Sequence, residues 1–332
     1  MPNIYTACAF LQEDRVRIGV GPEREGDPWI IDFPSLDRTH VGISPGGMMS
    51  FVPVPGPGDM FVSVMGLFPP FKGLGGGIFR HVRRQGGYEV SKVIDLPFAH
   101  RCDILHKNGK NYLFSATVSR FKDAPEDWSE PGEVYCTELS DPDAPAWQAD
   151  KVIDSLFRNH GMLRIQWDGR EVMAVSGAEG IFMLDVRQDG SVCVERLFDG
   201  EVSEFGLVDI DDDGQVELAT IEPFHGNTLC IYHRDGSVWN RIYESPLSFG
   251  HGLSAGILDS QGVVVVGNRR GASDLQLFYR GSRKIEMTCV ETGTGTTQSQ
   301  LFSWAGRDYI LAANQLKSEV AAYYLETSLS NL

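Results

Sequence analysis

The feature that most constrains the fold is an internal repeat of roughly 45 residues. Each unit contains short apolar runs separated by turns rich in Asp and Gly, such as "DDDGQ" and "HRDGS". Units of this kind open near residues 46, 98, 158, 203, 249 and 297. Four short strands in a repeat of this length are typical of one blade of a β-propeller. We therefore predict an all-β fold, a propeller of four-stranded blades.

The number of openings predicts six blades. Residues 1–45 precede the first unit, and the last unit stops after its third strand. The N-terminal segment, with "WIIDF" as the best candidate, is then expected to supply the missing outer strand and close the ring, which removes exposed sheet edges. Seven blades are the alternative, if "YTACAFL", "RVRIGVG" and "WIIDF" form a blade of their own. In both cases we expect residues 1–332 to form a single propeller domain.

Charge and composition exclude several classes of partner. Lys and Arg total 29 against 45 Asp and Glu, so the formal net charge is −16. Such a surface repels nucleic acids and anionic membranes. No run approaches the ~20 apolar residues of a membrane span, and no signal peptide is recognisable at the N-terminus. We expect a cytoplasmic protein without nucleic-acid or membrane partners. Its six cysteines lie singly and are expected to be buried free thiols.

A histidine recurs at the opening of three units. These residues are His100, His160 and His251, and a glycine follows the last two. The first strand of a propeller blade lines the central channel, so the three rings are predicted at one channel mouth. The glycine lets the backbone approach the axis closely. Three neutral imidazoles could hold a divalent metal such as Zn, Mn or Mg, or one ring could act as a base. The alternative is that each ring caps the channel, bonded to a carbonyl or a water.

The loops between second and third strands are predicted at the same mouth, because the strands of a blade alternate in direction. They carry the remaining candidate catalytic residues, which are Glu222, His225, Arg269 and Lys317. Insertions lengthen two of these loops, at 66–77 and 119–133, and are either binding loops or tolerated surface segments.

Aromatic residues near the predicted mouth could stack on a sugar ring, or could be core or loop packing. They are Phe71, Trp128 and Phe224. The remaining histidines are expected in loops or on outer strands, in contact with solvent. They are His40, His81, His106 and His233.

The stretch "DIDDDGQVEL" carries an acidic pattern around a glycine turn. Asp209, Asp211 and Asp213 alternate, and Glu217 follows Gly214. Oxygen ligands at this spacing suit a hard cation such as Ca²⁺, which would have a structural role. The alternative is an Asp-rich hairpin turn without a metal.

Two resemblances follow from these motifs. The Asp-rich turn resembles the calcium loops of FG-GAP and VCBS propeller repeats, with Glu217 in place of the last Asp. Together with "TIEPFHGNTLCIYHRDG" and the His-Gly openings, about residues 90–325 resemble the propeller domain of aldos-2-ulose dehydratase, the 1,5-anhydro-D-fructose dehydratase group. That family removes water from keto-sugars and uses metal ions. The cupin domains of its fungal members have no counterpart in this chain.

The resemblance implies a lyase that dehydrates a small keto-sugar by β-elimination. His225 or His160 would be the base, Arg269 or Lys317 would stabilise the enolate, and Glu222 would be the acid. The alternative is a non-catalytic FG-GAP-like propeller that binds a carbohydrate or a protein. A mouth rich in His, Arg and Glu favours the enzyme, and the net charge favours a small neutral sugar over a polyuronate.

Overall fold

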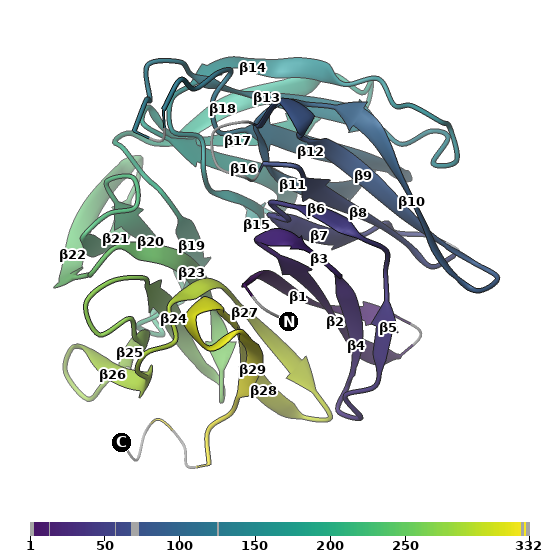
Figure 1. The fold of residues 1–332 in the computed structure, drawn as a ribbon. Helices are drawn as coiled ribbons and strands as arrows, with labels where there is room; N and C mark the ends of the chain where they lie inside the picture. The colour runs from purple at the N-terminus through teal and green to yellow at the C-terminus, as the bar shows by residue number, and fades with distance from the viewer. Residues whose placement is uncertain are drawn as a thin grey trace. The chain divides into compact units, whose positions relative to one another are not determined.

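A computed structural model describes the chain as strands joined by turns and loops (Figure 1). Two short 3-10 helices occur among the described residues, η1 (Gly73–Gly75) and η2 (Gln315–Lys317). None of the helices described there has the length and apolar character needed to cross a membrane. All six cysteines are free thiols, but the predicted burial holds only for Cys102, Cys136 and Cys230, whereas Cys8 and Cys193 are half-buried and Cys289 is exposed. The described residues are 3–12, 14–56, 58–67, 73–124, 126–326 and 329.

Seven antiparallel sheets follow one another along the described part of the chain, six with four strands and the last with three. The first contains β1 (Ile4–Gln12), β2 (Arg15–Pro22), β4 (Trp29–Phe33) and β5 (Arg38–His40). The second contains β7 (Ser50–Pro53), β8 (Met60–Met65), β9 (Gly77–Arg84) and β10 (Gly87–Asp95). The third contains β11 (Ala99–Lys107), β12 (Lys110–Thr117), β13 (Gly132–Glu138) and β14 (Asp150–Leu156). A small extra sheet pairs β3 (Arg24–Gly26) with β6 (Ser44–Gly46).

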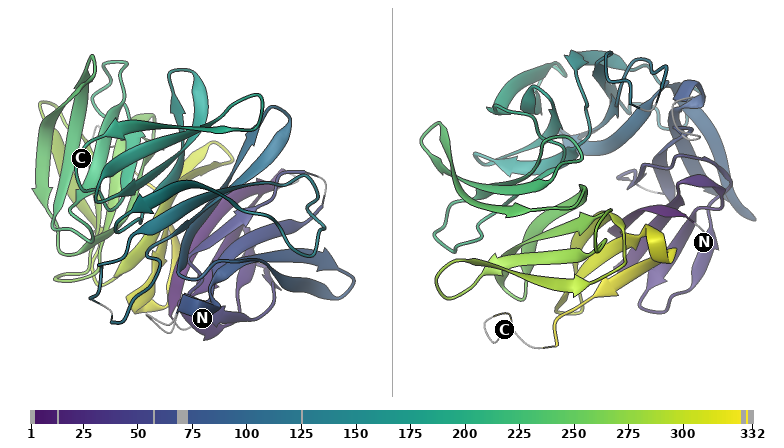
Figure 2. Two further views of the ribbon diagram at one scale, coloured as in Figure 1. Left: turned by 90° about the horizontal axis from the view of Figure 1, so that it is seen from above. Right: turned by 60° about the vertical axis from the view of Figure 1, so that its left-hand side comes forward.

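The later sheets repeat the same pattern, seen from two further directions in Figure 2. The fourth contains β15 (Met162–Trp167), β16 (Arg170–Gly177), β17 (Gly180–Val186) and β18 (Val192–Phe198). The fifth contains β19 (Phe205–Val208), β20 (Glu217–Glu222), β21 (Thr228–Asp235) and β22 (Val238–Pro246). The sixth contains β23 (Gly250–Leu258), β24 (Gln261–Asn268), β25 (Leu275–Arg280) and β26 (Ile285–Glu291). The seventh contains β27 (Thr296–Trp304), β28 (Arg307–Asn314) and β29 (Glu319–Tyr323).

The second to seventh sheets are meanders in which strands pair in chain order, and the first has the same form with β3 left out. This is the blade of a β-propeller, so the fold is a seven-bladed β-propeller and the predicted fold class is confirmed. The blade count is seven, the second of the two predicted numbers.

The N-terminal segment accounts for the additional blade. "WIIDF" is β4 and pairs with β2 and β5, so the expectation that it completes the last sheet was wrong. The physical reason is local. Two strand-forming runs come just before it in the chain, and pairing with them closes shorter loops than pairing with the C-terminal sheet.

The chain groups into two compact units, which we describe separately. The first contains residues 10–201, and the second contains residues 2–9 together with 202–332. Each unit has its own apolar clusters between neighbouring sheets. In the first unit one such cluster includes Phe114, Met173 and Leu184.

Strand β24 shows how the sequence builds these clusters in the second unit. Its run of four valines is fully buried. Val264 and Val266 belong to a cluster with residues of β20 and β21, whereas Val263 and Val265 belong to another that includes Ile310 of β28. Because side chains alternate across a strand, a strand buried on both faces reads as a continuous apolar run.

Residues 4–9 of β1 join the second unit through two glutamines of β27. The Gln298 side chain accepts a hydrogen bond from the Ala7 backbone N–H at 3.1 Å. The Gln300 side chain accepts one from the Ala9 N–H at 2.8 Å and donates one to the Ala9 carbonyl at 2.9 Å. The start of the chain is thereby attached to a strand near its end.

Candidate functional site

The opening histidines share a local backbone geometry. His100 in β11 and His251 in β23 each lie at a break in strand register, between Ala99 and Arg101 and between Gly250 and Gly252 respectively. Such β-bulges re-aim a side chain relative to the regular strand. A residue with positive φ lies two positions before each of the three histidines, namely Phe98 (59°), Arg158 (52°) and Phe249 (59°). The repeat therefore builds the same turn-and-bulge entry into different blades.

In the second unit, His251 is held in one orientation. Its ring is 1% exposed, and Nδ1 lies 2.8 Å from the Thr297 carbonyl oxygen. A carbonyl only accepts, so Nδ1 carries the proton and Nε2 of the neutral ring is an acceptor. The Tyr5 hydroxyl lies 3.0 Å from Nε2 and donates to it.

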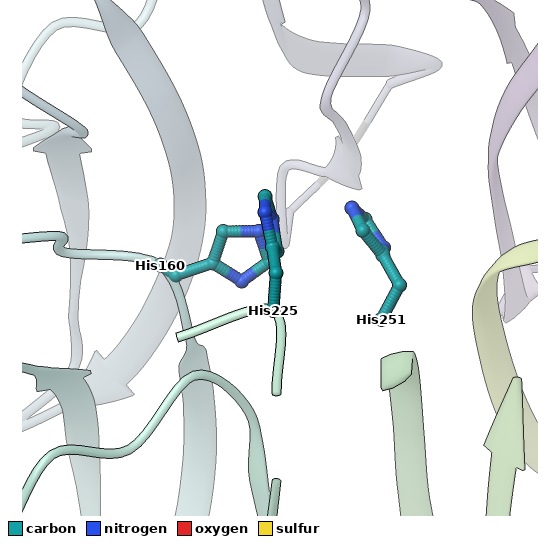
Figure 3. A group of neighbouring side chains, drawn as sticks. All are labelled: His160, His225 and His251. Carbon is teal, nitrogen blue, oxygen red and sulfur yellow. The ribbon is translucent and has the colours of Figure 1, made fainter. Parts of the chain in front are cut away.

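His225 lies in the loop between β20 and β21 and stacks on His251. The two ring centroids are 5.1 Å apart and the planes are inclined by 23°. Figure 3 shows the two side chains. Phe224 stacks on the His225 ring, with the two ring centroids 3.9 Å apart. One ring nitrogen of each histidine lies within 4.8 Å of the other, which is close enough for a shared ligand. Figure 3 also labels His160, a residue of the first unit.

Tyr5 and Arg269 extend this cluster. Tyr5 is 5% exposed. Its backbone carbonyl accepts a hydrogen bond from the Thr297 hydroxyl at 2.6 Å. The Arg269 guanidinium lies 5.8 Å from the centroid of the Tyr5 ring and donates to the Gln315 side chain. We call Tyr5, His225, His251 and Arg269 the His-Tyr-Arg cluster. Tyr5 was missed because nothing in the sequence relates residue 5 to residue 251.

The glycine after His251 is required by close packing. A Cβ on Gly252 would lie 3.2 Å from both the Cα and the backbone N of Gln298, and 3.3 Å from the Thr297 carbonyl carbon. The missing side chain lets β27 pass close enough for its carbonyl to bond the His251 ring. The His-Gly pair predicted a close approach of the backbone to the channel axis, whereas the approach observed at Gly252 is to β27.

Two other predicted catalytic residues have partners of their own in the second unit. The Glu222 carboxylate accepts hydrogen bonds from the Thr220 hydroxyl at 2.6 Å and from the Tyr232 hydroxyl at 3.0 Å. Lys317 pairs with Glu291, and this hydrogen bond holds the Glu291 pKa below its usual range. The roles of Glu222 as acid and of Lys317 as enolate cation stay predictions.

The first unit contains its own histidine pair. The rings of His100 and His160 have centroids 4.5 Å apart and are both buried. Arg101, which no sequence motif marked as a candidate site residue, is also buried. It donates to the His160 carbonyl and to the Met49 carbonyl, each at 3.2 Å. A buried guanidinium thus fixes the backbone at His160.

The inserted loop 119–133 carries a buried lysine over an aromatic ring. The Lys122 ammonium lies 3.0 Å from the centroid of the Trp128 ring, and the residue is 4% exposed. Burial lowers the Lys122 pKa to about 8, and the charges of Asp127 and Glu126 oppose this shift. One face of Trp128 is therefore occupied by the ammonium. Phe71, the other aromatic predicted in an inserted loop, lies outside the described residues.

The Asp-rich turn connects β19 to β20, and most of its carboxylates bond the backbone of the same turn. Asp209 accepts from the N–H groups of Asp213 at 3.2 Å and Gly214 at 2.8 Å. Glu217 is fully buried and accepts from Ile210 N–H at 3.0 Å and from His233 Nδ1 at 2.9 Å. These bonds are those of an Asp-rich hairpin.

The same turn also groups oxygens in the way a cation needs. One carboxylate oxygen each of Asp209, Asp211 and Glu217 lies within 4.8 Å of the others. Asp211 Oδ1 is buried and has no hydrogen-bond partner among the described residues. Burial raises the pKa of Glu217, and its hydrogen bond from His233 opposes this shift. The turn therefore has the donor set for Ca²⁺, and its Asp209, Asp213 and Glu217 also make internal hydrogen bonds, whereas Asp211 Oδ1 has none with a described residue.

One of the four histidines expected in solvent is instead a core residue. His81 is fully buried, with Nδ1 donating to the Val41 carbonyl at 2.9 Å and Nε2 accepting from the Ser63 hydroxyl at 2.8 Å. Burial lowers its pKa to about 4. The expectation failed because β9, where His81 lies, is an inner strand of its sheet. His40 and His106 are exposed, and His233 is half-buried against Glu217.

Comparison with known proteins identifies the class of fold. No family model matches the chain, and no curated protein matches it in sequence. A Bacteroides uniformis protein provisionally named 6-phosphogluconolactonase is 11% identical, with a TM-score of 0.60 over 92% of this chain and 89% of that one. A Bacteroides fragilis protein with the same provisional name is 11% identical, with a TM-score of 0.59 over 90% and 86%.

A further similar structure is the Dos1 propeller, 10% identical, with a TM-score of 0.56 over 95% of this chain and 76% of that chain. At such identities these likenesses support the propeller fold alone. The resemblance to FG-GAP repeats and to aldos-2-ulose dehydratase stays a prediction.

Proposed function

We propose that the protein is a lyase that removes water from a small keto-sugar by β-elimination. The observation that carries this proposal is the His-Tyr-Arg cluster, in which two imidazoles, a phenol and a guanidinium lie together. Tyr5 and His251 are buried, and His225 and Arg269 are half-buried. Two structural neighbours carry names that refer to a phosphorylated sugar lactone, which also favours a carbohydrate as substrate.

The reaction needs a base, a positive charge and an acid. In the proposal, a ring nitrogen of His225 takes the proton from the carbon next to the carbonyl. The electron pair of that C–H bond forms the new double bond, and the hydroxyl on the next carbon leaves as water with a proton from Glu222. Arg269, with Lys317 as the second candidate, opposes the negative charge on the enolate oxygen. Tyr5 and Thr297 hold the His251 ring beside the base.

The sequence-based proposal also places a divalent metal, Zn, Mn or Mg, on His100, His160 and His251. The hydrogen bonds of His251 fit this role, because a ring that donates Nδ1–H to a carbonyl presents Nε2 as the ligand atom. Tyr5 would have to release Nε2 for a metal to bind. When bound, such a metal would polarise the sugar carbonyl. A structural Ca²⁺ on Asp209, Asp211, Asp213 and Glu217 is proposed separately.

The test uses 1,5-anhydro-D-fructose as the probe and measures loss of the substrate and formation of the enone by absorbance and NMR. We expect His225→Gln and Arg269→Gln each to lower kcat/KM by about 10²- to 10⁴-fold. Tyr5→Phe should change the pH profile of kcat. His106→Gln is the matched control, because His106 is exposed and, among the described residues, its side chain bonds Asn111 of the paired strand. Metal analysis of the wild type and of His251→Gln tests the metal.

The second candidate function is a non-catalytic propeller that binds a carbohydrate or a protein. It is favoured by the hydrogen bonds on both ring nitrogens of His251, which fit a structural ring as well as an orienting one. Saturable binding of 1,5-anhydro-D-fructose without turnover in any metal-supplemented sample would select this function and reject the lyase. Equal activity of His225→Gln and the wild type would also reject the proposed base.

A further inference from the structure

A groove on the outer part of the first unit is lined by none of the three opening histidines. It has a volume of about 730 Å³, which is within the range of small-molecule sites. Strand β5, the outermost strand of the first sheet, forms one wall, and the β9–β10 hairpin of the second sheet forms the other. The residues that line it include Arg38, His40, Gly42, Arg83, Tyr88 and Val90.

The groove is a basic site on an acidic protein. Arg38 and Arg83 both line it, one from each wall, and none of its described lining residues is acidic. Neither guanidinium makes an ion pair with a described residue, whereas Arg17, Arg164 and Arg170 each pair with an aspartate. Two arginines that make no ion pair with a described residue thus lie in one concave site, although the net charge of the protein is −16.

The two walls of the groove approach each other closely at Gly42. Gly42 has φ of 104°, and a Cβ there would lie 2.3 Å from Val90 Cγ2. Gly86 and Gly87 also have positive φ, 98° and 153°, and they turn the hairpin beside Arg83. Tyr88 is fixed by the hydrogen bond from its hydroxyl to Asp59 at 2.5 Å, and the Arg83 guanidinium lies 5.2 Å from its ring centroid.

We propose that this groove binds the phosphate group of a small phosphorylated molecule, with Arg38 and Arg83 as the principal ligands. A phosphate has oxygens in tetrahedral directions, so it can accept hydrogen bonds from guanidinium groups that approach from two walls. A single carboxylate is planar and is satisfied by one bidentate arginine. His40 lies at the same wall as Arg38 and contacts Trp29 with ring planes inclined by 60°. Its Nε2 pairs with Asp27 at 3.2 Å, and its Nδ1 can donate to a third oxygen.

The remaining volume sets the size of the ligand. A phosphate alone fills a small part of 730 Å³, so the site has room for the body of a small organic phosphate. Tyr88 and the exposed Ile43 supply apolar surface for that body. This proposal does not depend on the proposed lyase activity, because it uses none of the same residues.

Binding to the full-length protein tests the proposal, with inorganic phosphate and glycerol phosphate as probes in calorimetry and amide NMR. We expect both probes to bind, with glycerol phosphate the tighter, and to shift the amide signals of Gly42, Gly86 and Gly87. The variants R38Q and R83Q should each raise the dissociation constant about tenfold, because each removes charge-assisted hydrogen bonds. R280Q is the matched control, since Arg280 is exposed on β25 and makes no ion pair with a described residue.

Four results would overturn the proposal. They are no measurable phosphate binding by the wild type, unchanged binding by the R38Q/R83Q double variant, a loss in R280Q equal to that in R38Q, and binding of succinate as tight as that of glycerol phosphate. The last result would indicate a dicarboxylate site. Far-UV circular dichroism and Tm of each variant show whether it is folded, and we expect no change because both arginines are exposed.

Discussion

His81 and His251 are both buried and have the same kinds of hydrogen bond, and their surroundings distinguish them. His81 donates to a backbone carbonyl and accepts from a serine hydroxyl inside an apolar core. His251 has the same two kinds of bond, but its acceptor nitrogen faces a tyrosine hydroxyl and its ring stacks on a second imidazole. The first is a satisfied core residue, whereas the second belongs to a group of ionisable side chains.

His81 makes stability depend on pH. Its pKa is about 4 in the folded protein and about 6.5 when unfolded, so between these values the unfolded state binds more protons. Stability therefore falls as the pH decreases from 7 toward 4.5, and His81 accounts for about 2 to 3 kcal/mol of the loss. Urea unfolding at several pH values should show this, and His81→Gln should have a shallower dependence.

His106→Gln is the control for the pH experiment, because that ring is exposed. It should leave the dependence of the unfolding free energy on pH as in the wild type. A slope that is the same in His81→Gln and in the wild type would show that His81 is not buried as a neutral ring.

At the scale of the strand, the repeated element is a turn followed by a bulge. The register of β27 breaks between Thr296 and Gln298, as it does around His100 and His251 in their strands. Gly295, two residues before Thr297, has positive φ, as Phe249 has two residues before His251. Thr297 thus occupies in β27 the place that His251 occupies in β23. The Thr297 carbonyl accepts a hydrogen bond from His251 Nδ1, and the Thr297 hydroxyl donates one to the Tyr5 carbonyl. The bulge in β27 therefore holds the His251 ring, which lies at the bulge in β23.

Gly252 tests the packing between these two bulged strands. Gly252→Ala places a methyl group 3.2 Å from backbone atoms of Gln298, so we expect a loss of about 1 to 3 kcal/mol in the free energy of unfolding. Gly26→Ala, where the nearest atoms are at 3.7 Å, should change it by less than about 1 kcal/mol. Denaturant unfolding measures both, and equal losses in the two variants would contradict the role of close packing.

The Asp-rich turn makes a second prediction at the scale of the element. If it binds Ca²⁺, adding CaCl₂ to the chelator-treated protein should raise Tm, because a ligand that binds only the folded state stabilises it by mass action. Asp211→Asn should abolish the shift, since Asp211 Oδ1 has no hydrogen-bond partner among the described residues. Asp235→Asn, in the exposed β21–β22 hairpin, should retain it. The absence of any calcium-dependent shift in the wild type would leave an Asp-rich hairpin turn.

At the scale of the whole chain, the N-terminal strand is attached to the second unit by side chains of β27. Replacing Gln298 and Gln300 together by Ala removes hydrogen bonds to Thr6, Ala7 and Ala9 and leaves buried backbone groups unbonded. We expect a loss of about 2 to 4 kcal/mol and faster proteolysis before residue 10. Thermal unfolding and limited proteolysis with mass spectrometry measure these effects.

Gln188→Ala is the control for the glutamine pair, because Gln188 lies exposed in the β17–β18 hairpin. It should leave Tm and the proteolytic pattern unchanged. A double variant as resistant as the wild type would mean that β1 is held chiefly by its strand pairing.

The sequence determined the repeated four-stranded unit, and with it the all-β propeller class, because apolar alternation and Asp-Gly turns are local properties. It also indicated the special backbone at His251, since His-Gly at a strand opening marks a close approach. The sequence left the blade count open, because "WIIDF" suits either an inner or an outer strand. Only the tertiary structure decided that Tyr5 and Arg269 lie beside His251, that His81 is buried and that Arg38 and Arg83 line one groove. Those outcomes depend on contacts between residues far apart in the chain, which local periodicity does not encode.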